Sequence, residues 1–164
     1  MKTLYLLRHA KSSWGDASLP DRDRPLEARG ERDAARMSKR WSQRIEKPAL
    51  ILSSPAARAF ETAKVVARGL DCKSKAIAID ERLYAATERT LLAVVEALDD
   101  KLDRVMLVGH NPGFTELAHH FDSSITHLPT CALVEFRFEA GSWAGIGRAR
   151  PSSMFVDSPK RPSA

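Results

Sequence analysis

Residues 4–10 read LYLLRHA, so that four apolar residues run directly into Arg8 and His9. A continuous apolar run of this length predicts a buried strand of a parallel sheet over residues 3–8. Many strands end on polar side chains by accident, and the pair alone decides little. The fold and the function therefore depend on what the other strand ends of the chain carry.

The rest of the chain alternates between strand-like and helix-like patterns. One apolar stripe at helical spacing predicts a helix over about 26–45 and consists of Ala34, Met37, Trp41 and Ile45. Further elements are expected as strands at 49–53, about 75–79 and 104–108, and as helices that begin at Ser54–Pro55, at Thr87 or Glu88 and at Asn111–Pro112. This alternation predicts an α/β fold, a three-layer α/β/α sandwich with a mostly parallel central sheet.

The end of the chain has a different pattern. Residues 131–140 (CALVEFRFEA) and about 147–156 are expected to form two late strands that add an antiparallel edge to the sheet. The length of 164 residues suits one core, so we expect a single domain over 1–158. The last residues, 159–164, are expected to be a disordered tail.

Composition excludes several classes of protein. A hydrophobic fraction of 43% and a charged fraction of 29% are ordinary for a soluble globular domain, and no apolar run approaches the roughly 18 residues of a membrane span. The first residues are expected to form a strand, because their apolar run is too short for a signal peptide and Arg8 interrupts it. Two distant cysteines, Cys72 and Cys131, suit reduced thiols and a cytoplasmic location.

The net charge of +5 favours acidic partners without identifying them. It motivates a nucleic-acid-binding domain as a third hypothesis, but aromatic residues are only 7% and scattered, and no basic stripe stands out. We therefore expect neither a nucleic acid nor a membrane as a partner. The sequence does not indicate an oligomeric state.

The predicted strand ends carry matching groups. Besides Arg8 and His9, the second strand runs into SSPAAR with Arg58, and the fourth ends on GHNPG with His110. Ligands of open parallel sheets bind beyond the carboxyl ends of the strands, where helix N-termini also offer free N–H groups. None of these three junctions contains a carboxylate. The sequence therefore predicts a pocket for a dianion, most simply a phosphoryl group.

These residue types suit phosphoryl transfer. Arginine guanidinium groups match the oxygens of a phosphate with forked donors, and a neutral imidazole is a nucleophile toward phosphorus. Nearby arginines keep such an imidazole neutral by like-charge repulsion, while a second, protonated histidine neutralises charge on the transferring group. We expect no metal and no cofactor, and the P-loop pattern of nucleotide hydrolases does not occur.

Five stretches together resemble the histidine phosphatase superfamily, also called phosphoglycerate mutase-like, and within it the SixA-like phosphohistidine phosphatases: LYLLRHAKSSW, DRDRPLEARG, LILSSPAARAFETA, DERLY and VMLVGHNPG. The resemblance extends from about Leu4 to Lys160, with Ala10 where the family commonly has glycine. It implies that His9 is the nucleophile and that three residues bind the phosphoryl oxygens, namely Arg8, Arg58 and His110. It also makes Arg24 a candidate for a further contact to the anion.

The chain departs from this family in one respect that bears on the substrate. Relatives that act on alkyl phosphates protonate the leaving alkoxide with a carboxylic acid, usually in the loop after the third strand. Here that region reads DERLYAATE, where Glu81 comes early and Glu88 is expected to begin a helix. A departing imidazole, with a pKa of about 6.5, depends far less on an enzyme acid. This favours phosphohistidine as the substrate.

Two alternatives remain open from the sequence. The chain is either a metal-independent phosphatase that acts on a phosphorylated protein or a small labile phosphoryl compound, or a phosphoryl-ligand binding protein with little turnover. A broad small-molecule phosphomonoesterase is a variant of the first. Within the loop of residues 9–25, Lys11, Ser12 and Ser13 either touch substrate or belong to a solvated loop. The tryptophans are expected to be structural.

Overall fold

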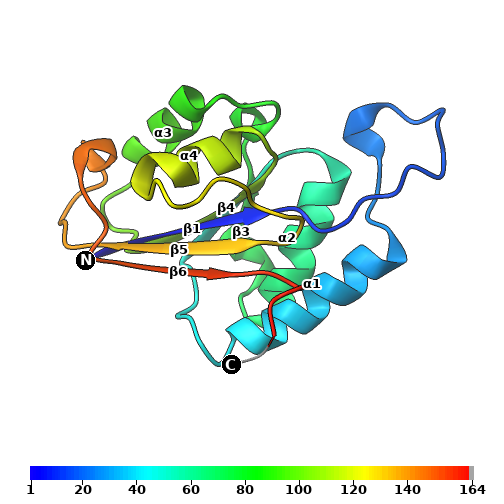
Figure 1. The fold of residues 1–164 in the computed structure, drawn as a ribbon, viewed down its shortest axis with the longest axis horizontal. Helices are drawn as coiled ribbons and strands as arrows, with labels where there is room; N and C mark the ends of the chain where they lie inside the picture. Colours follow the sequence, from blue (N-terminus) through cyan, green and yellow to red (C-terminus); the bar gives the residue numbers. More distant parts are fainter. Residues whose placement is uncertain (163–164) are drawn as a thin grey trace.

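The structure is a computed structural model that describes residues 1–162, and its central sheet is shown in Figure 1. Within these residues the sheet has six strands in the order β3-β2-β4-β1-β5-β6. Their bounds are β1 Lys2–Arg8, β2 Leu50–Ser53, β3 Ile77–Ile79, β4 Arg104–Gly109, β5 Leu133–Phe138 and β6 Ser153–Asp157. Parallel pairing joins β3, β2, β4 and β1, whereas β5 and β6 add antiparallel pairs. The predicted sheet with an antiparallel edge is confirmed.

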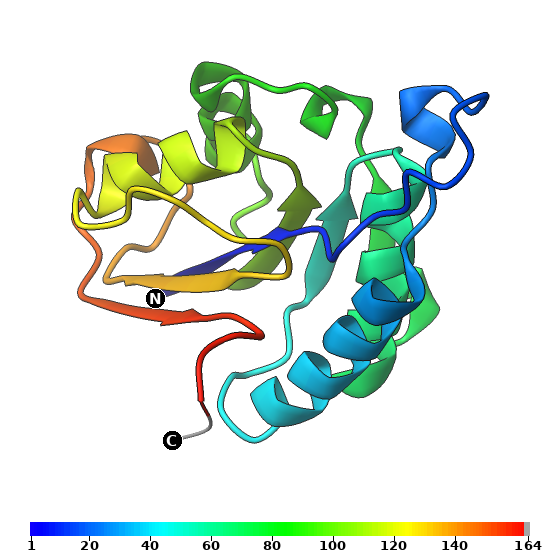
Figure 2. The ribbon, with the colours of Figure 1, turned by 45° about the vertical axis from the view of Figure 1, so that its right-hand side comes forward.

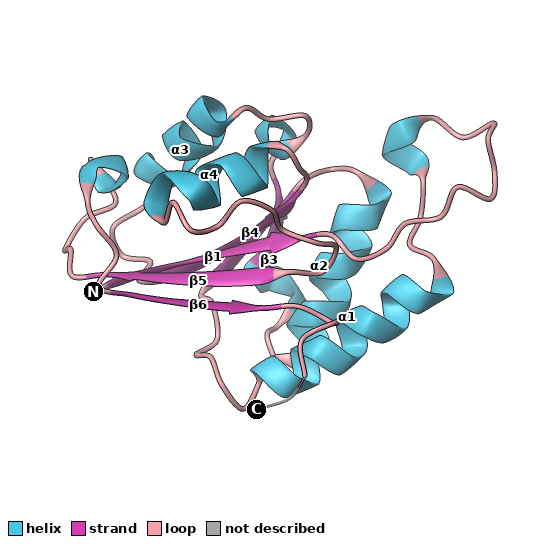
Figure 3. Ribbon diagram, viewed as in Figure 1, coloured by secondary structure: helices cyan, strands magenta, loops and turns pink. Residues whose placement is uncertain are grey.

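Helices cover both faces of this sheet, as Figures 2 and 3 show. One face carries α1 (Ala28–Trp41) and α2 (Ala57–Gly69), which pack side by side, and the other carries α3 (Glu88–Glu96) and α4 (Gly113–Phe121). This is the predicted three-layer α/β/α sandwich. None of the described helices is long and apolar enough to cross a lipid bilayer.

The apolar run of β1 supplies both halves of the core. Successive side chains of a strand point to opposite faces, so Leu4 and Leu6 pack against α3 and α4, while Tyr5 and Leu7 pack toward α1 and α2. All four side chains are fully buried. Burial on both faces explains why the run is continuous rather than alternating.

Several element boundaries differ from the sequence-based expectation, among them the end of α1, which lies at Trp41 rather than near Ile45. Ser54 and Pro55 precede α2, whose N-cap is Ala56, and the Ser54 hydroxyl both accepts the Ala56 N–H and bonds His110. The last strand begins at Ser153 rather than near Gly147, which lies in a short 3-10 helix, packs closely on Leu92 and donates its N–H to Glu96. At Gly147 contacts from a distant segment, α3, override the local pattern.

Disorder of the tail, residues 159–164, stays a prediction, and in the structure two carbonyl oxygens of its described part accept hydrogen bonds from α1. The carbonyl oxygen of Pro159 accepts a hydrogen bond from Arg36 at 3.0 Å, and that of Arg161 accepts one from Arg40 at 3.2 Å. These bonds hold residues 159–162 against α1. The remaining two residues of the expected tail, 163 and 164, lie outside the described residues.

The long loop between β1 and α1 folds back on itself beyond the end of β1 (Figure 1). Its two arms are joined by backbone hydrogen bonds from Ser13 to Pro25, at 2.8 Å, and from Glu27 to Lys11, at 2.9 Å. Gly30 in the first turn of α1 lies so close that a Cβ there would overlap the carbonyl oxygen of Lys11. The glycine that weakens this helix therefore allows the loop to pack on it.

We predict that Gly30→Ala lowers the free energy of unfolding by about 1–3 kcal/mol, because the methyl group has no space. Helix propensity alone predicts the opposite sign, a gain of about 1 kcal/mol. Urea unfolding of this variant and of Gly141→Ala, where nothing lies within 4 Å of the added Cβ, measures the difference. A stabilised Gly30→Ala protein would contradict the close packing.

Candidate active site

The register of the parallel strands brings the three predicted junctions together. Arg8 of β1 pairs with Gly109 of β4, and Ser53 of β2 pairs with Val108. Backbone bonds continue past the strand ends, from His9 N–H to the Gly109 carbonyl at 3.0 Å and from Ser54 N–H to the Val108 carbonyl at 2.9 Å. The side chains that follow the three strands therefore share one edge of the sheet.

His9 is buried and held in one orientation. Its exposed fraction is 7%, and Nδ1 lies 2.7 Å from the carbonyl oxygen of Ala10, which can only accept a hydrogen bond. Nδ1 therefore carries the hydrogen of the neutral ring, and Nε2 keeps its lone pair. Burial lowers the pKa of His9 to about 4. The hydrogen bond to Ala10 raises the pKa, whereas the positive charges of Arg58 and Arg8 lower it further. The imidazole is therefore neutral at pH 7, with a free lone pair on Nε2.

Ala10 stands at the position where the resemblance leads one to expect glycine. Its side chain is fully buried, and its N–H donates to the hydroxyl of Thr62 at 3.0 Å. Thr62 in turn donates to the carbonyl oxygen of Arg58 at 2.7 Å. The methyl group therefore fits within the core, and Ala10 links the end of β1 to the first turn of α2.

His110 lies beside His9, with ring centroids 5.2 Å apart. Its Nε2 is 2.7 Å from the Ser54 hydroxyl, which also accepts the N–H of Ala56 at 3.2 Å. When the hydroxyl donates to Nε2, Nδ1 carries a hydrogen. Burial lowers the pKa of His110 to about 3, and the positive charges of His9 and Arg58 add to this effect. Burial thus keeps the second histidine neutral rather than protonated, and Nδ1 is a donor in the tautomer in which Ser54 donates to Nε2.

The two arginines have different surroundings. Arg8 donates from Nη1 to the Leu128 carbonyl oxygen at 3.0 Å, and burial lowers its pKa. Arg58 is 6% exposed and donates from Nη1 and Nη2 to the backbone oxygen and the carboxylate of Asp21, at 2.7 and 2.9 Å. The first turn of α2 thus holds a buried guanidinium group that is already directed at an anion.

Buried N–H groups without partners are concentrated at this site. Among the described residues, four buried side-chain nitrogen or oxygen atoms lack a hydrogen-bond partner, and three of them are Arg8 Nε, Arg58 Nε and His110 Nδ1. An unsatisfied buried donor costs about 1–3 kcal/mol, and native proteins have few of them. Three such donors from three strand ends are a site suited to a ligand with several acceptor oxygens.

Asp21 is the carboxylate that the sequence analysis did not place here. It comes from the loop rather than from a junction, and Tyr84 donates to it at 2.6 Å, as does Arg24 at 3.2 Å. These bonds, chiefly the one from Tyr84, and the charge of Arg58 hold the pKa of Asp21 well below its usual range. Asp21 is the first residue of the DRDRPL stretch and lies three positions before Arg24, a candidate for an anion contact. This closeness is the sequence feature that could have identified Asp21.

The remaining candidates have clear positions. Arg24 is 7% exposed, and its positive charge lowers the pKa of His9. Its Nε donates to Asp21, and its Nη1 donates to Ser12 and Ser13. A contact between Arg24 and a bound anion therefore stays a prediction. Glu81, which comes early in DERLYAATE, is exposed and forms an ion pair with Arg22 at 2.6 Å.

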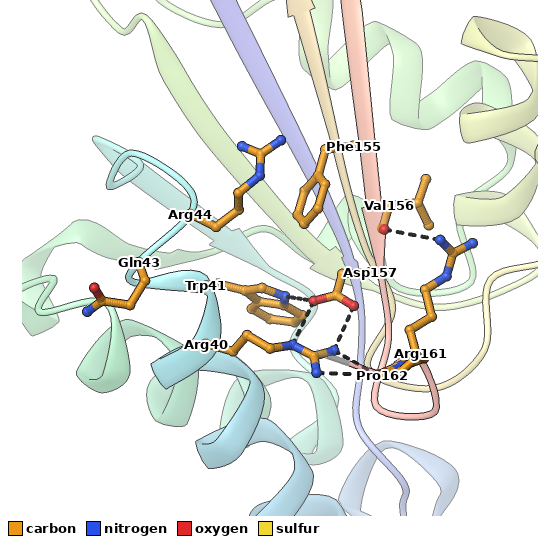
Figure 4. A pocket seen from close by; sticks show the side chains of 9 residues that line it. All are labelled: Arg40, Trp41, Gln43, Arg44, Phe155, Val156, Asp157, Arg161 and Pro162. Carbon is orange, nitrogen blue, oxygen red and sulfur yellow. Dashed lines mark hydrogen bonds and ion pairs between the residues drawn. The ribbon is translucent and has the colours of Figure 1, made fainter. Parts of the chain in front are cut away.

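A separate hollow of about 500 Å³ lies between the end of α1 and β6. Figure 4 shows its lining, in which Asp157 accepts bonds from Arg40 at 2.7 Å and from the Trp41 indole at 2.9 Å. None of the predicted site residues lines it. Its polar groups tie β6 to α1, and we assign it a structural role.

A family model confirms the resemblance inferred from the sequence. The histidine phosphatase superfamily (branch 1) matches residues 4–86. The chain belongs to this superfamily. Members of a phosphatase family take phosphorylated substrates, which agrees with the anion site at the strand ends.

Several proteins are similar over most of this chain. An uncharacterized chloroplastic protein of Arabidopsis thaliana is 34% identical over 152 residues, covering 87% of this chain and 69% of that protein. The crystal structure of a protein assigned as the phosphohistidine phosphatase SixA of Agrobacterium tumefaciens has a TM-score of 0.79 and 27% identity, over 96% of this chain and 99% of that one. A protein histidine phosphatase SixA complexed with tungstate has a TM-score of 0.80 at 20% identity, over 96% and 97% of the two chains, which shows the shared fold.

The buried histidines predict a specific pH dependence. The pKa values of His9 and His110, about 4 and 3, are below the unfolded value of about 6.5. Between pH 6.5 and pH 4 the unfolded chain binds protons that the folded protein does not, so the free energy of unfolding falls as the pH is lowered. We expect ¹⁵N NMR to show both rings neutral at pH 5.5. Midpoints near pH 6.5 would contradict the buried, neutral pair.

Proposed function

We propose that this chain hydrolyses phosphohistidine through a transient phosphoryl group on His9. The observation that carries the proposal is the set of unpartnered buried N–H groups on Arg8, Arg58 and His110, beside a neutral His9. A phosphoryl group supplies the acceptor oxygens that these donors lack. The 27% identical SixA neighbour supports the choice of phosphohistidine within the superfamily.

The chemistry takes two displacements at phosphorus. In the first, the lone pair of His9 Nε2 forms a P–N bond while the P–N bond of the substrate breaks and the substrate imidazole leaves with that electron pair. In the second, a water oxygen attacks phosphorus, the bond to His9 breaks and its electron pair returns to Nε2. The proton that the water loses passes to a phosphate oxygen and then to solvent as inorganic phosphate leaves. Arg8, Arg58 and His110 donate to the equatorial oxygens throughout, and this stabilises the charge spread over them.

The carboxylates near the site favour a nitrogen leaving group. Asp21 is ionised because its pKa is held well below the usual range, and Glu81 is paired with Arg22. Asp21 therefore has no proton to give to an alkoxide at pH 7, and the Glu81 carboxylate is engaged by Arg22. A phosphoimidazole protonated on its second nitrogen departs as neutral imidazole and takes no proton from the enzyme. This separates the proposed substrate from alkyl phosphates.

We predict that His9→Ala lowers kcat on free phosphohistidine by at least about a thousandfold, because no nucleophile remains. His127→Ala, which removes an exposed imidazole, is the matched control and is expected to stay within twofold of the wild type. Phosphate release measured in the presence of EDTA also tests the proposed metal independence. Full activity of His9→Ala, or complete loss of wild-type activity in EDTA, would refute the mechanism.

We further predict that kcat/KM for phosphohistidine exceeds that for an alkyl phosphate by at least about 100-fold, since a general acid contributes roughly 10²–10⁴ to alkoxide departure. Both substrates are assayed with the same enzyme preparation at pH 7. Equal values would favour a broad phosphomonoesterase.

The runner-up is a phosphoryl-ligand binding protein with little turnover. The observation that favours it is Asp21, whose carboxylate and backbone oxygen already use both terminal nitrogens of Arg58. A protein of this kind binds phosphate or tungstate but releases no phosphate from phosphohistidine under steady-state conditions. Measurable steady-state turnover excludes it.

A further inference from the structure

The tryptophans are expected to have structural roles, and Trp14 does not fit this expectation. Trp41 and Trp143 are fully buried, whereas Trp14 is 76% exposed on the loop beyond β1. Large aromatic side chains gain most from burial, and exposed ones are enriched where proteins bind partners. The same loop also exposes Leu19, at 36%. This part of the surface therefore needs an explanation other than packing.

The indole is held in place although it is exposed. The guanidinium carbon of Arg24 lies 3.5 Å from the centroid of the ring, close enough for a cation–π contact. Arg24 is fixed in turn by bonds to the Ser12 hydroxyl, at 2.9 Å, and to the Ser13 carbonyl oxygen, at 3.2 Å. A rigid aromatic side chain loses little conformational entropy when a partner binds to it.

Trp14 is connected to the reacting groups by a short series of contacts. Arg24 stacks on the indole and donates a hydrogen bond to Asp21, and Asp21 accepts a second hydrogen bond from Arg58. The same loop lies beyond the carboxyl end of β1 (Figure 2), where His9 follows the strand. In-line displacement by His9 places the leaving group on the far side of phosphorus, so the body of a large substrate extends outward over the loops at this edge.

We propose that Trp14, backed by Arg24, is a docking residue for the polypeptide that carries the phosphohistidine. This rests on the proposed function and deepens it, because it makes a protein rather than a free amino acid the preferred substrate. An apolar side chain of the substrate protein packs on the exposed part of the indole, while the phosphoryl group reaches Arg8, Arg58 and His110. Free phosphohistidine has no polypeptide to make this contact.

The test compares two substrates that share the same chemistry. One is a small protein phosphorylated on histidine with potassium phosphoramidate, and the other is free phosphohistidine. For Trp14→Ala we expect the ratio of kcat/KM for the protein to kcat/KM for the amino acid to fall roughly tenfold, as for an aromatic contact at an interface, and for Trp14→Phe to fall less. Met154→Ala removes another exposed apolar side chain, on β6, and should leave the ratio unchanged.

Acrylamide quenching of tryptophan fluorescence gives a second readout without turnover. Because the other two indoles are buried, quenching of the folded protein reports chiefly on Trp14. Adding the phosphorylated protein to the His9→Ala variant should reduce quenching, whereas free phosphohistidine should not.

Two results would overturn the docking proposal and leave the proposed phosphatase activity intact. An unchanged ratio in Trp14→Ala means that the indole makes no contact with the protein substrate. An equal loss on both substrates means that Trp14 only supports Arg24. If the wild type releases phosphate from neither substrate, the proposed function itself fails and the docking role fails with it. Circular dichroism of the variants shows that they are folded.

Discussion

The register between neighbouring parallel strands is the constraint on which the site depends. Pairing of Arg8 with Gly109 and of Ser53 with Val108 places the ends of β1, β4 and β2 level with one another. A slip of one residue would turn each following side chain to the other face of the sheet. The fully buried side chains of Leu4, Tyr5, Leu6 and Leu7 exclude such a slip, because they fill the cores on both faces. The packing of the strand therefore also aligns the chemistry.

Burial has opposite consequences for the two kinds of basic residue at this edge. It keeps His9 and His110 neutral, which preserves a lone pair on His9 and a donor on His110. It leaves Arg8 and Arg58 with N–H groups that find no partner among residues 1–162. Asp21 offsets part of the positive charge from the loop side and, because it is ionised, offers no proton. Together these effects suit a dianion whose leaving group departs without help from an acid.

The sequence was sufficient to predict what depends on short, regular patterns. The apolar run of β1, the helical stripe of α1 and the groups after three strands have local signals, and the order of a parallel sheet brings such strand ends to one edge. Ser54 and Trp14 have no comparable signal, and Asp21 has only its place three residues before Arg24 in the stretch DRDRPL. The Ser54 hydroxyl bonds His110 as well as the start of α2, and Asp21 and Trp14 lie on a loop that passes close to Gly30 at Lys11. Such contacts follow from the tertiary fold rather than from spacing along the chain.

The central claim is that Arg8, Arg58 and His110 direct unpaired N–H groups at one shared anion. Titration with tungstate, followed by the ¹H–¹⁵N NMR signals of the two arginine Nε–H groups and of His110 Nδ1, tests it most directly. We expect all three signals to move together and to saturate at one tungstate per chain. Signals that stay in place in the folded protein, or that respond at different tungstate concentrations, would contradict it.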